Sequence, residues 1–133
     1  MRTLKEQVLD RYSEVIGARP KRVTNRKCES LVQDKLPFRG SNMYGEWKSP
    51  LPTTEPPVYV VYSWGEHFPL YIYEPTKDEW FINTDGTTNS SIQHRWDAQL
   101  KDVSYLPLDC DTMIDIINRG ICTVYAEALE ETQ

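Results

Sequence analysis

The chain has 133 residues, of which 39% are hydrophobic and 26% charged, and this length and balance predict a single domain spanning residues 1–133. No stretch approaches the ~18 consecutive apolar residues of a membrane span. No apolar run follows the opening Met-Arg-Thr-Leu either, so we expect a cytoplasmic protein without a membrane segment or a secretory signal. Three widely spaced cysteines, with no Cys-x-x-Cys pair and no histidine near them, argue against a zinc site or a disulfide framework. We therefore expect no metal and no cofactor.

The net charge of −5 is unevenly spread along the chain. Residues 19–39 carry seven basic and two acidic side chains, whereas residues 40–133 carry five basic and fifteen acidic ones. Such asymmetry is typical of a protein that attracts or orients a charged partner. The alternative is that these charges only solvate two faces of the domain.

Two helices are expected near the N-terminus. Residues 4–16 place apolar side chains at helical spacing, and Thr3 with Glu6 fits a capping box, in which each side chain accepts a hydrogen bond from a free backbone amide. Gly17 is expected to end this helix in a left-handed conformation. A shorter helix is predicted over residues 26–35.

Residues 37–57 contain two glycines and five prolines, a density that predicts a long loop without regular structure. Three segments rich in β-branched and aromatic residues follow, at 58–63, 70–74 and 79–83. Their short connections predict an antiparallel meander. The polar stretch 84–99 is expected to be an irregular loop.

The remaining elements complete the predicted fold. Residues 92–100 are expected to form a turn of helix, 103–106 a fourth strand and 112–118 a buried helix. Residues 121–126 fit either a closing strand or the start of a last helix, and the acidic tail 127–133 is expected to fray. The sequence thus predicts an α+β fold, in which an antiparallel meander sheet of three to five strands packs with an N-terminal and a C-terminal helix.

His67, Asp85 and His94 are the candidate catalytic residues. They follow the first and third predicted strands, and in a meander these two connections return to the same edge of the sheet. Two imidazoles and a carboxylate can bind a metal ion or act as acid and base, which is the chemistry of a small metal-assisted hydrolase or nuclease. The competing interpretation is that they cap the backbone of irregular loops, since no Gly-x-Ser-x-Gly or His-Glu-x-x-His motif is present.

Aromatic and basic side chains form the candidate binding surface. Exposed tryptophans often mark binding surfaces, and basic residues near aromatic ones can contact the phosphates and bases of nucleic acid. The overall acidity argues against tight non-specific DNA binding. The candidate residues are Trp64, Tyr44, Trp47, Trp96, Arg22, Arg26 and Lys27.

One motif resembles a known family. The chain reads Ser-Trp-Gly-Glu-His-Phe-Pro over residues 63–69 directly after a predicted strand, and Trp80, an Asn-Thr-Asp at 83–85 and a Thr/Ser-rich stretch ending in His94 follow. This pattern resembles an uncharacterised family of small proteins common in tailed-phage and prophage genomes. The resemblance covers about residues 22–118 and implies a phage or mobile-element origin, without implying an activity.

Small acidic phage proteins without a catalytic signature often act by binding host machinery. We therefore expect a phage-encoded accessory protein, rather than an enzyme, that binds a host or bacterial defence protein and inhibits or modulates it in the host cytoplasm. Two alternatives stay open. One is the metal-assisted hydrolase or nuclease described above, and the other is a nucleic-acid-binding protein acting through residues 19–39.

Overall fold

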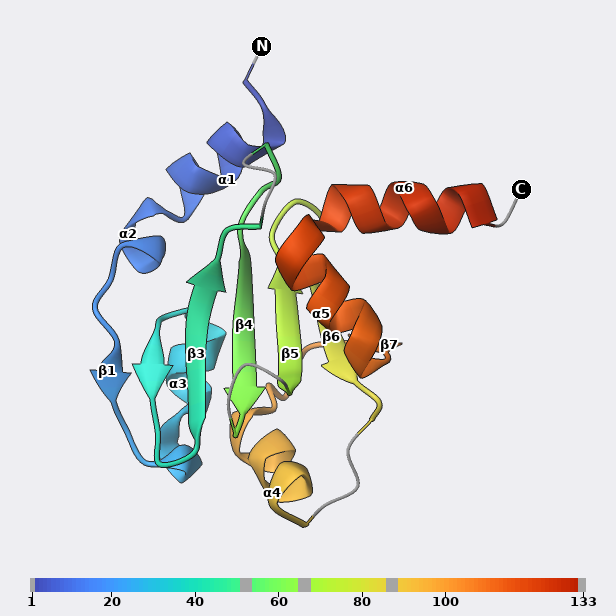
Figure 1. The fold of residues 1–133 in the computed structure, drawn as a ribbon. Helices are drawn as coiled ribbons and strands as arrows, with labels where there is room; N and C mark the ends of the chain where they lie inside the picture. Colours follow the sequence, from blue (N-terminus) through green and yellow to red (C-terminus); the bar gives the residue numbers. More distant parts are fainter. Residues whose placement is uncertain (1, 51–53, 65–67, 86–88, 132–133) are drawn as a thin grey trace.

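The structure is a computed structural model that describes residues 2–50, 54–64, 68–85 and 89–131. Its described residues form one seven-stranded sheet whose spatial order follows the chain (Figure 1). The strands are β1 (Lys21–Arg22), β2 (Phe38–Arg39), β3 (Met43–Lys48), β4 (Val58–Ser63), β5 (Pro69–Glu74), β6 (Glu79–Asn83) and β7 (Tyr105–Leu108). The helices are α1 (Leu4–Arg11), α2 (Ser13–Ile16), the 3-10 turn η1 (Asn25–Lys27), α3 (Glu29–Gln33), α4 (Asn89–Ala98), α5 (Cys110–Arg119) and α6 (Ile121–Glu131).

The sheet is mixed because a parallel pair of strands lies at each end of an antiparallel centre. β1 and β2 pair in parallel and are joined through η1 and α3, and β6 and β7 pair in parallel and are joined through α4. The pairs from β2 to β6 are antiparallel. Parallel neighbours need a long crossover, which these helical segments provide. The predicted antiparallel meander of three to five strands is therefore wrong as a fold class, although its three central strands exist as β4, β5 and β6.

Residues 37–57 are not the loop that their glycines and prolines suggest, since β2 and β3 lie within them. Gly45 sits inside β3 for a packing reason. A Cβ added there would lie 2.5 Å from both the Phe38 ring and the Tyr59 hydroxyl. A glycine inside a strand can mark close approach of neighbouring groups rather than a turn, and that is the case here. Likewise, the predicted irregular stretch 84–99 contains the ten-residue helix α4.

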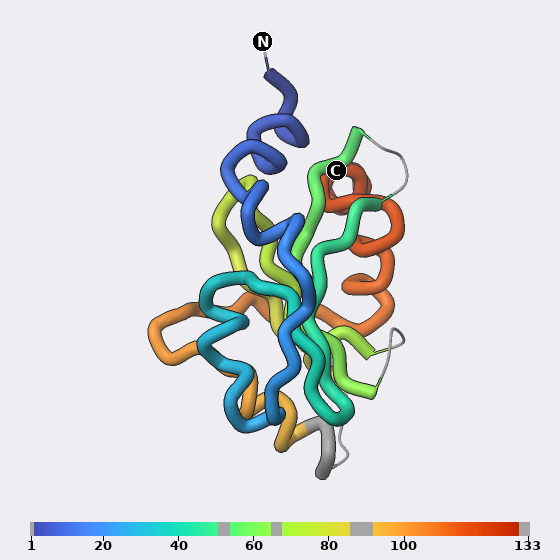
Figure 2. Tube along the Cα trace, turned by 90° about the vertical axis from the view of Figure 1, so that its left-hand side faces the viewer, coloured from blue at the N-terminus to red at the C-terminus, as the bar shows by residue number. Residues whose placement is uncertain are grey.

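Helices cover both faces of the sheet (Figure 2). Tyr59 and Val61 of β4 face a core formed with α3 and with Ala98 at the end of α4. The alternate residues of β4, such as Val60, face α5 and the start of α6. Every residue of β4 and of β5 is buried, which explains why both strands read as continuous apolar and aromatic runs.

Buried tyrosines form hydrogen bonds with the segments that cover the sheet face packed against α3 and α4. The Tyr59 hydroxyl donates to the carbonyl of Leu36 at 2.7 Å, and the Tyr71 hydroxyl donates to the carbonyl of Arg95 at 2.8 Å. Each bond satisfies a buried polar atom and links a strand to the layer above it. The rings therefore fill the core while their hydroxyls position the segment after α3 and helix α4.

The N-terminal helix is shorter than predicted. Thr3 caps the helix as predicted, with the Glu6 amide donating to the Thr3 hydroxyl oxygen and the Thr3 hydroxyl donating to the Glu6 carboxylate, each at 3.1 Å. The helix then breaks at Tyr12 into α1 and α2. Gly17 has φ −86°, so the expected left-handed stop is wrong. The predicted helix 26–35 is likewise divided, into η1 and α3.

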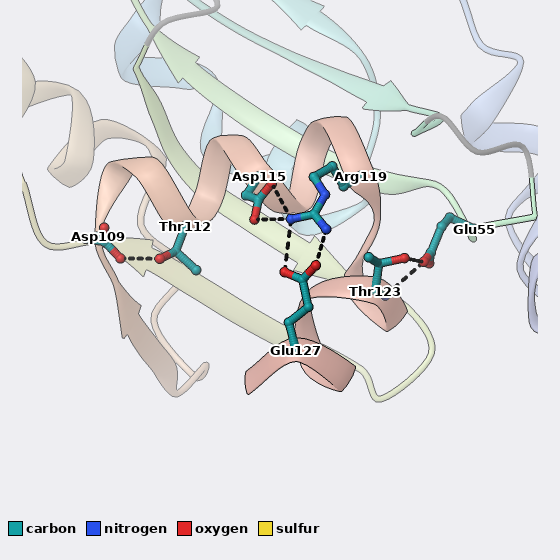
Figure 3. A network of polar contacts seen from close by, with 7 residues as sticks. All are labelled: Glu55, Asp109, Thr112, Asp115, Arg119, Thr123 and Glu127. Atoms are coloured by element: carbon teal, nitrogen blue, oxygen red, sulfur yellow. Dashed lines mark hydrogen bonds and ion pairs between the residues drawn. The ribbon is translucent and has the colours of Figure 1, made fainter. Parts of the chain in front are cut away.

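A sharp corner joins α5 to α6. Gly120 has φ +100° and ψ 150°, a backbone conformation that residues with a side chain rarely adopt. The buried Glu55 caps α6 from a distant part of the chain, since its carboxylate accepts from the Thr123 amide at 2.9 Å and from the Cys122 amide at 3.2 Å (Figure 3). Residues 121–131 therefore form a helix rather than a strand, and the tail expected to fray from residue 127 stays helical through residue 131.

Exposed ion pairs link α5 and α6 at the same corner. Arg119 contacts Asp115 one turn earlier at 3.1 Å and Glu127 of the following helix (Figure 3). The two carboxylates raise the pKa of the Arg119 guanidinium, and Arg119 in turn lowers the pKa of Glu127. These groups are exposed, so the pairs orient α6 more than they stabilise the fold.

Candidate functional site

One edge of the sheet gathers four of the residues selected from the sequence, namely Asp85, His94, Trp64 and Trp96. β4, β6 and β7 run in the same direction, so their carboxyl ends share this edge with the start of α5 and with α4 (Figure 1). His94 of α4 reaches β4, where its Nδ1 lies 2.5 Å from the Ser63 hydroxyl oxygen. Asp85 and His94, which both follow β6, therefore lie at the same edge as the end of β4. His67 lies outside the described residues.

His94 is part of the packing at this edge. It is 4% exposed, and its partner Ser63 is fully buried. Burial lowers the pKa of His94, against a smaller opposing effect of the Asp97 carboxylate, which favours a neutral imidazole at pH 7. The Trp64 ring lies beside the imidazole, with 5.8 Å between the ring centroids. A catalytic base must reach its substrate, and His94 is shielded from solvent on this edge.

Asp85 acts as a helix cap. Its carboxylate accepts from the amide of Cys110, the first residue of α5, at 2.9 Å, and its own amide donates to the Asn83 side chain at 2.8 Å. A carboxylate at a helix N-terminus is favoured both by the free amide and by the helix dipole. Asp85 and His94 thus share an edge but bond to different backbone and side-chain partners. Among the described residues, no group of three His, Cys, Asp or Glu side chains is close enough to hold a metal ion.

The three cysteine thiols have raised pKa values. Burial, with the Asp97 charge as a second cause, raises the pKa of Cys28 to about 12. Burial also raises the pKa of Cys110 and of Cys122, in both cases with help from nearby carboxylates. All three are free thiols, and thiols with raised pKa values remain protonated and weakly reactive at pH 7.

The aromatic residues at this edge are accessible. Trp64 is 63% exposed, Trp96 is 68% exposed and Ile92 is 42% exposed. We call these three residues the Trp64 rim. Trp64 is held in a left-handed conformation, with φ +65°, and its amide donates to the carbonyl of Asn42 at 2.9 Å. This conformation costs about 1 kcal/mol for a residue other than glycine, so the surrounding structure fixes an indole ring that stays in solvent.

The other two aromatic candidates are less accessible. Trp47 is half-buried, donates its indole N–H to the carbonyl of Lys35 at 2.9 Å and packs against Tyr12 and Tyr59. It therefore belongs to the core rather than to a binding surface. Tyr44 is half-buried and stacks on the Tyr62 ring at a centroid distance of 4.7 Å.

The basic candidates lie on the β1 side of the sheet, and η1 also contacts α4. Arg22 is in β1, and Arg26 and Lys27 are in η1, and all three are exposed. Sequence reasoning did not select Arg39, which pairs with Tyr44 across β2 and β3 and lies over its ring at 5.9 Å. Only the strand register reveals this arrangement, because β2 and β3 were predicted to be loop.

Comparison with known proteins gives no further assignment, since no family model, no curated protein and no solved structure matches the chain. Among the helices of the described residues, none is both long enough and apolar enough to cross a bilayer. The geometry of the site itself therefore carries the functional argument.

Proposed function

We propose that the protein is a non-catalytic binding protein that engages a partner protein through the Trp64 rim. The observation that carries this proposal is the exposure of two tryptophans, Trp64 at the end of β4 and Trp96 on α4. Tryptophan is enriched among the residues that dominate binding energy in protein interfaces, because a large rigid ring buries much apolar area at low entropic cost. An indole ring held in solvent by a strained backbone supports a role in recognition.

The enzyme alternative has weaker support. His94 is buried against Ser63, and the Asp85 carboxylate caps α5. Both side chains therefore make structural contacts, whereas the catalytic hypothesis requires them to be free to react with a substrate. The cysteines, with their raised pKa values, offer no replacement.

The resemblance to small phage proteins suggests the kind of partner. A phage-encoded accessory protein would act in the host cytoplasm on a host or bacterial defence protein, as inhibitor or modulator. We propose this class of partner on the strength of the Ser-Trp-Gly-Glu-His-Phe-Pro motif over residues 63–69, which contains Trp64.

Affinity capture with matched variants tests the proposal. The wild-type protein, the double variant Trp64→Ala/Trp96→Ala and the control Leu129→Ala are immobilised and exposed to a bacterial lysate. Leu129 is an apolar side chain on α6 that is 66% exposed, so the control removes exposed apolar surface on a different element. We expect one protein to be retained by the wild type and the control and lost with the double variant. Equal retention by all three proteins, or retention of nothing by the wild type, contradicts the proposal.

A further inference from the structure

One part of the sheet face next to α5 and α6 is left without a helical cover. α5 and the start of α6 pack on side chains of β4, β5 and β6, whereas the same face of β1, β2 and β3 lies beyond them (Figure 1). Strand register places Arg22 beside Arg39, Arg39 beside Tyr44 and Tyr44 beside Tyr62. A row of two arginines and two stacked tyrosines therefore crosses this face.

Two adjoining cavities lie along this row, of about 350 Å³ and about 330 Å³. They share the wall formed by residues 39–41, and one extends to Tyr44 and Trp64 while the other extends to Arg22. We call them together the Arg39 groove. None of the described residues that line it is acidic.

The shared wall is held in place by Asn25. Its side-chain oxygen accepts from the Ser41 amide at 3.1 Å, and its side-chain nitrogen donates to the Asn42 side chain at 2.7 Å. A Cβ on Gly40 would lie 2.2 Å from the same Asn25 oxygen, so this tight turn needs a glycine. The groove is therefore preformed, which lowers the entropic cost of binding a ligand.

The groove is locally basic although the protein is acidic. Arg22 and Arg39 line it, and within the described part of the chain neither forms an ion pair. The acidic helices α5 and α6 lie over the other half of the sheet, with α5 packed on β5. β5 is three strands away from β2, so α5 lies roughly 14 Å from β2 along the sheet at the usual strand spacing. Charges at that distance are largely screened at physiological salt, where the Debye length is about 8 Å.

We propose that the Arg39 groove binds single-stranded nucleic acid, with Arg22 and Arg39 contacting phosphates and the exposed ring of Trp64 stacking on a base. Proteins that bind single strands combine a basic groove with aromatic rings on which bases stack. A duplex keeps its bases stacked inside, so a single strand fits the accessible indole better. An acidic protein segment would also match the arginines, and the competition experiment below tests it. The groove shares Trp64 with the proposed partner-protein surface but not Trp96, which does not line it. The arginine variants and Trp96→Ala therefore separate this inference from the proposed function.

Fluorescence anisotropy tests the inference with labelled oligo(dT) and oligo(rU) probes of about 12 nucleotides, a length within the usual site sizes. Two phosphate contacts predict that the logarithm of the binding constant falls with the logarithm of salt concentration at a slope of about −1.4, from about −0.7 per contact. Arg39→Gln should weaken binding at least about fivefold and bring the slope near −0.7. The control Lys101→Gln removes the same charge from an exposed position outside the groove and should leave affinity within about twofold.

Three further arms complete the test. Stacking predicts that Trp64→Ala weakens binding about fivefold or more and reduces the quenching of tryptophan fluorescence by the probe, while Trp96→Ala leaves both unchanged. The tighter of the two probes identifies DNA or RNA as the source of the strand. The inference is overturned if neither probe binds at about 50 mM salt, if Arg39→Gln and Lys101→Gln weaken binding equally, or if poly-glutamate competes as well as the probes do. If the wild-type protein binds the probe but retains no protein from the lysate, this inference stands and only the proposed function is contradicted.

Discussion

Replacing Gly120 by alanine should destabilise the protein by about 2 to 5 kcal/mol, a large part of the 5–15 kcal/mol typical of a domain. Two effects contribute. The conformation at Gly120, with φ +100° and ψ 150°, costs a residue with a Cβ about 1–3 kcal/mol. The added Cβ would also lie 2.2 Å from two carbons of the Glu55 side chain. Glu55 must then leave the amides of Cys122 and Thr123, and the loss of such a cap costs about 1–2 kcal/mol.

Urea unfolding monitored by tryptophan fluorescence measures this change, with two variants that separate its causes. Glu55→Gln removes the charged cap without adding a Cβ and should cost about 1–2 kcal/mol. Gly17→Ala is the matched control at a helix end, because Gly17 has φ −86° and a Cβ there would meet the Ser13 carbonyl oxygen at an ordinary 3.4 Å. It should be neutral or stabilise by up to about 1 kcal/mol. A loss below about 1 kcal/mol for Gly120→Ala, or equal losses for both glycines, would refute the reasoning.

Three further predictions follow from the described contacts. Because burial lowers the pKa of His94, its contribution is complete above the unfolded value of about 6.5 and is lost as pH falls through the folded pKa. Urea titrations from pH 8 to pH 5 should therefore show the stability of the wild type falling relative to His94→Gln, whereas parallel curves would contradict this. Asp85→Asn should lower the pKa of Cys110, which the Asp85 charge helps to raise, and site-resolved alkylation rates against pH report that shift; an unchanged profile would count against it. Trp47→Phe should destabilise by about 1 kcal/mol through loss of the hydrogen bond to Lys35, and chemical denaturation would reveal an unchanged stability if the contact were unimportant.

The central strands of the fold were predictable, but the outer ones were not. Residues 58–63 and 79–83 are apolar and aromatic because helices cover both faces of the sheet, and this signal placed β4 and β6 correctly. β3 alternates inward and outward residues, but Gly45 and the surrounding prolines concealed it. Gly45 is required because Phe38 and Tyr59 pack closely against it, and this contact forms only when the strands pair. The parallel pairing of β7 likewise depends on α4, for which the polar sequence predicted a loop with only a turn of helix, at residues 92–100.

The location of the candidate site was predictable, but the roles of its residues were not. Strand direction alone brings the connections after β4 and β6 to one edge, and His94 and Asp85 lie there. Their tasks depend on elements later in the chain. Asp85 caps a helix that begins 25 residues further on, at Cys110, once β7 has returned to the same edge. His94 is buried because the segment around it is helical and packs on Ser63. Local sequence carries neither fact.

Titration calorimetry with the captured partner, once purified, tests the central claim most directly. Trp96 lies on α4 with 68% of its surface exposed, so Trp96→Ala should leave the stability of the free protein within about 0.5 kcal/mol. The account predicts that this variant binds the partner at least about tenfold more weakly than the wild type, as expected for a tryptophan that dominates an interface. A dissociation constant within about twofold of the wild-type value would show that the partner binds elsewhere and would contradict the account.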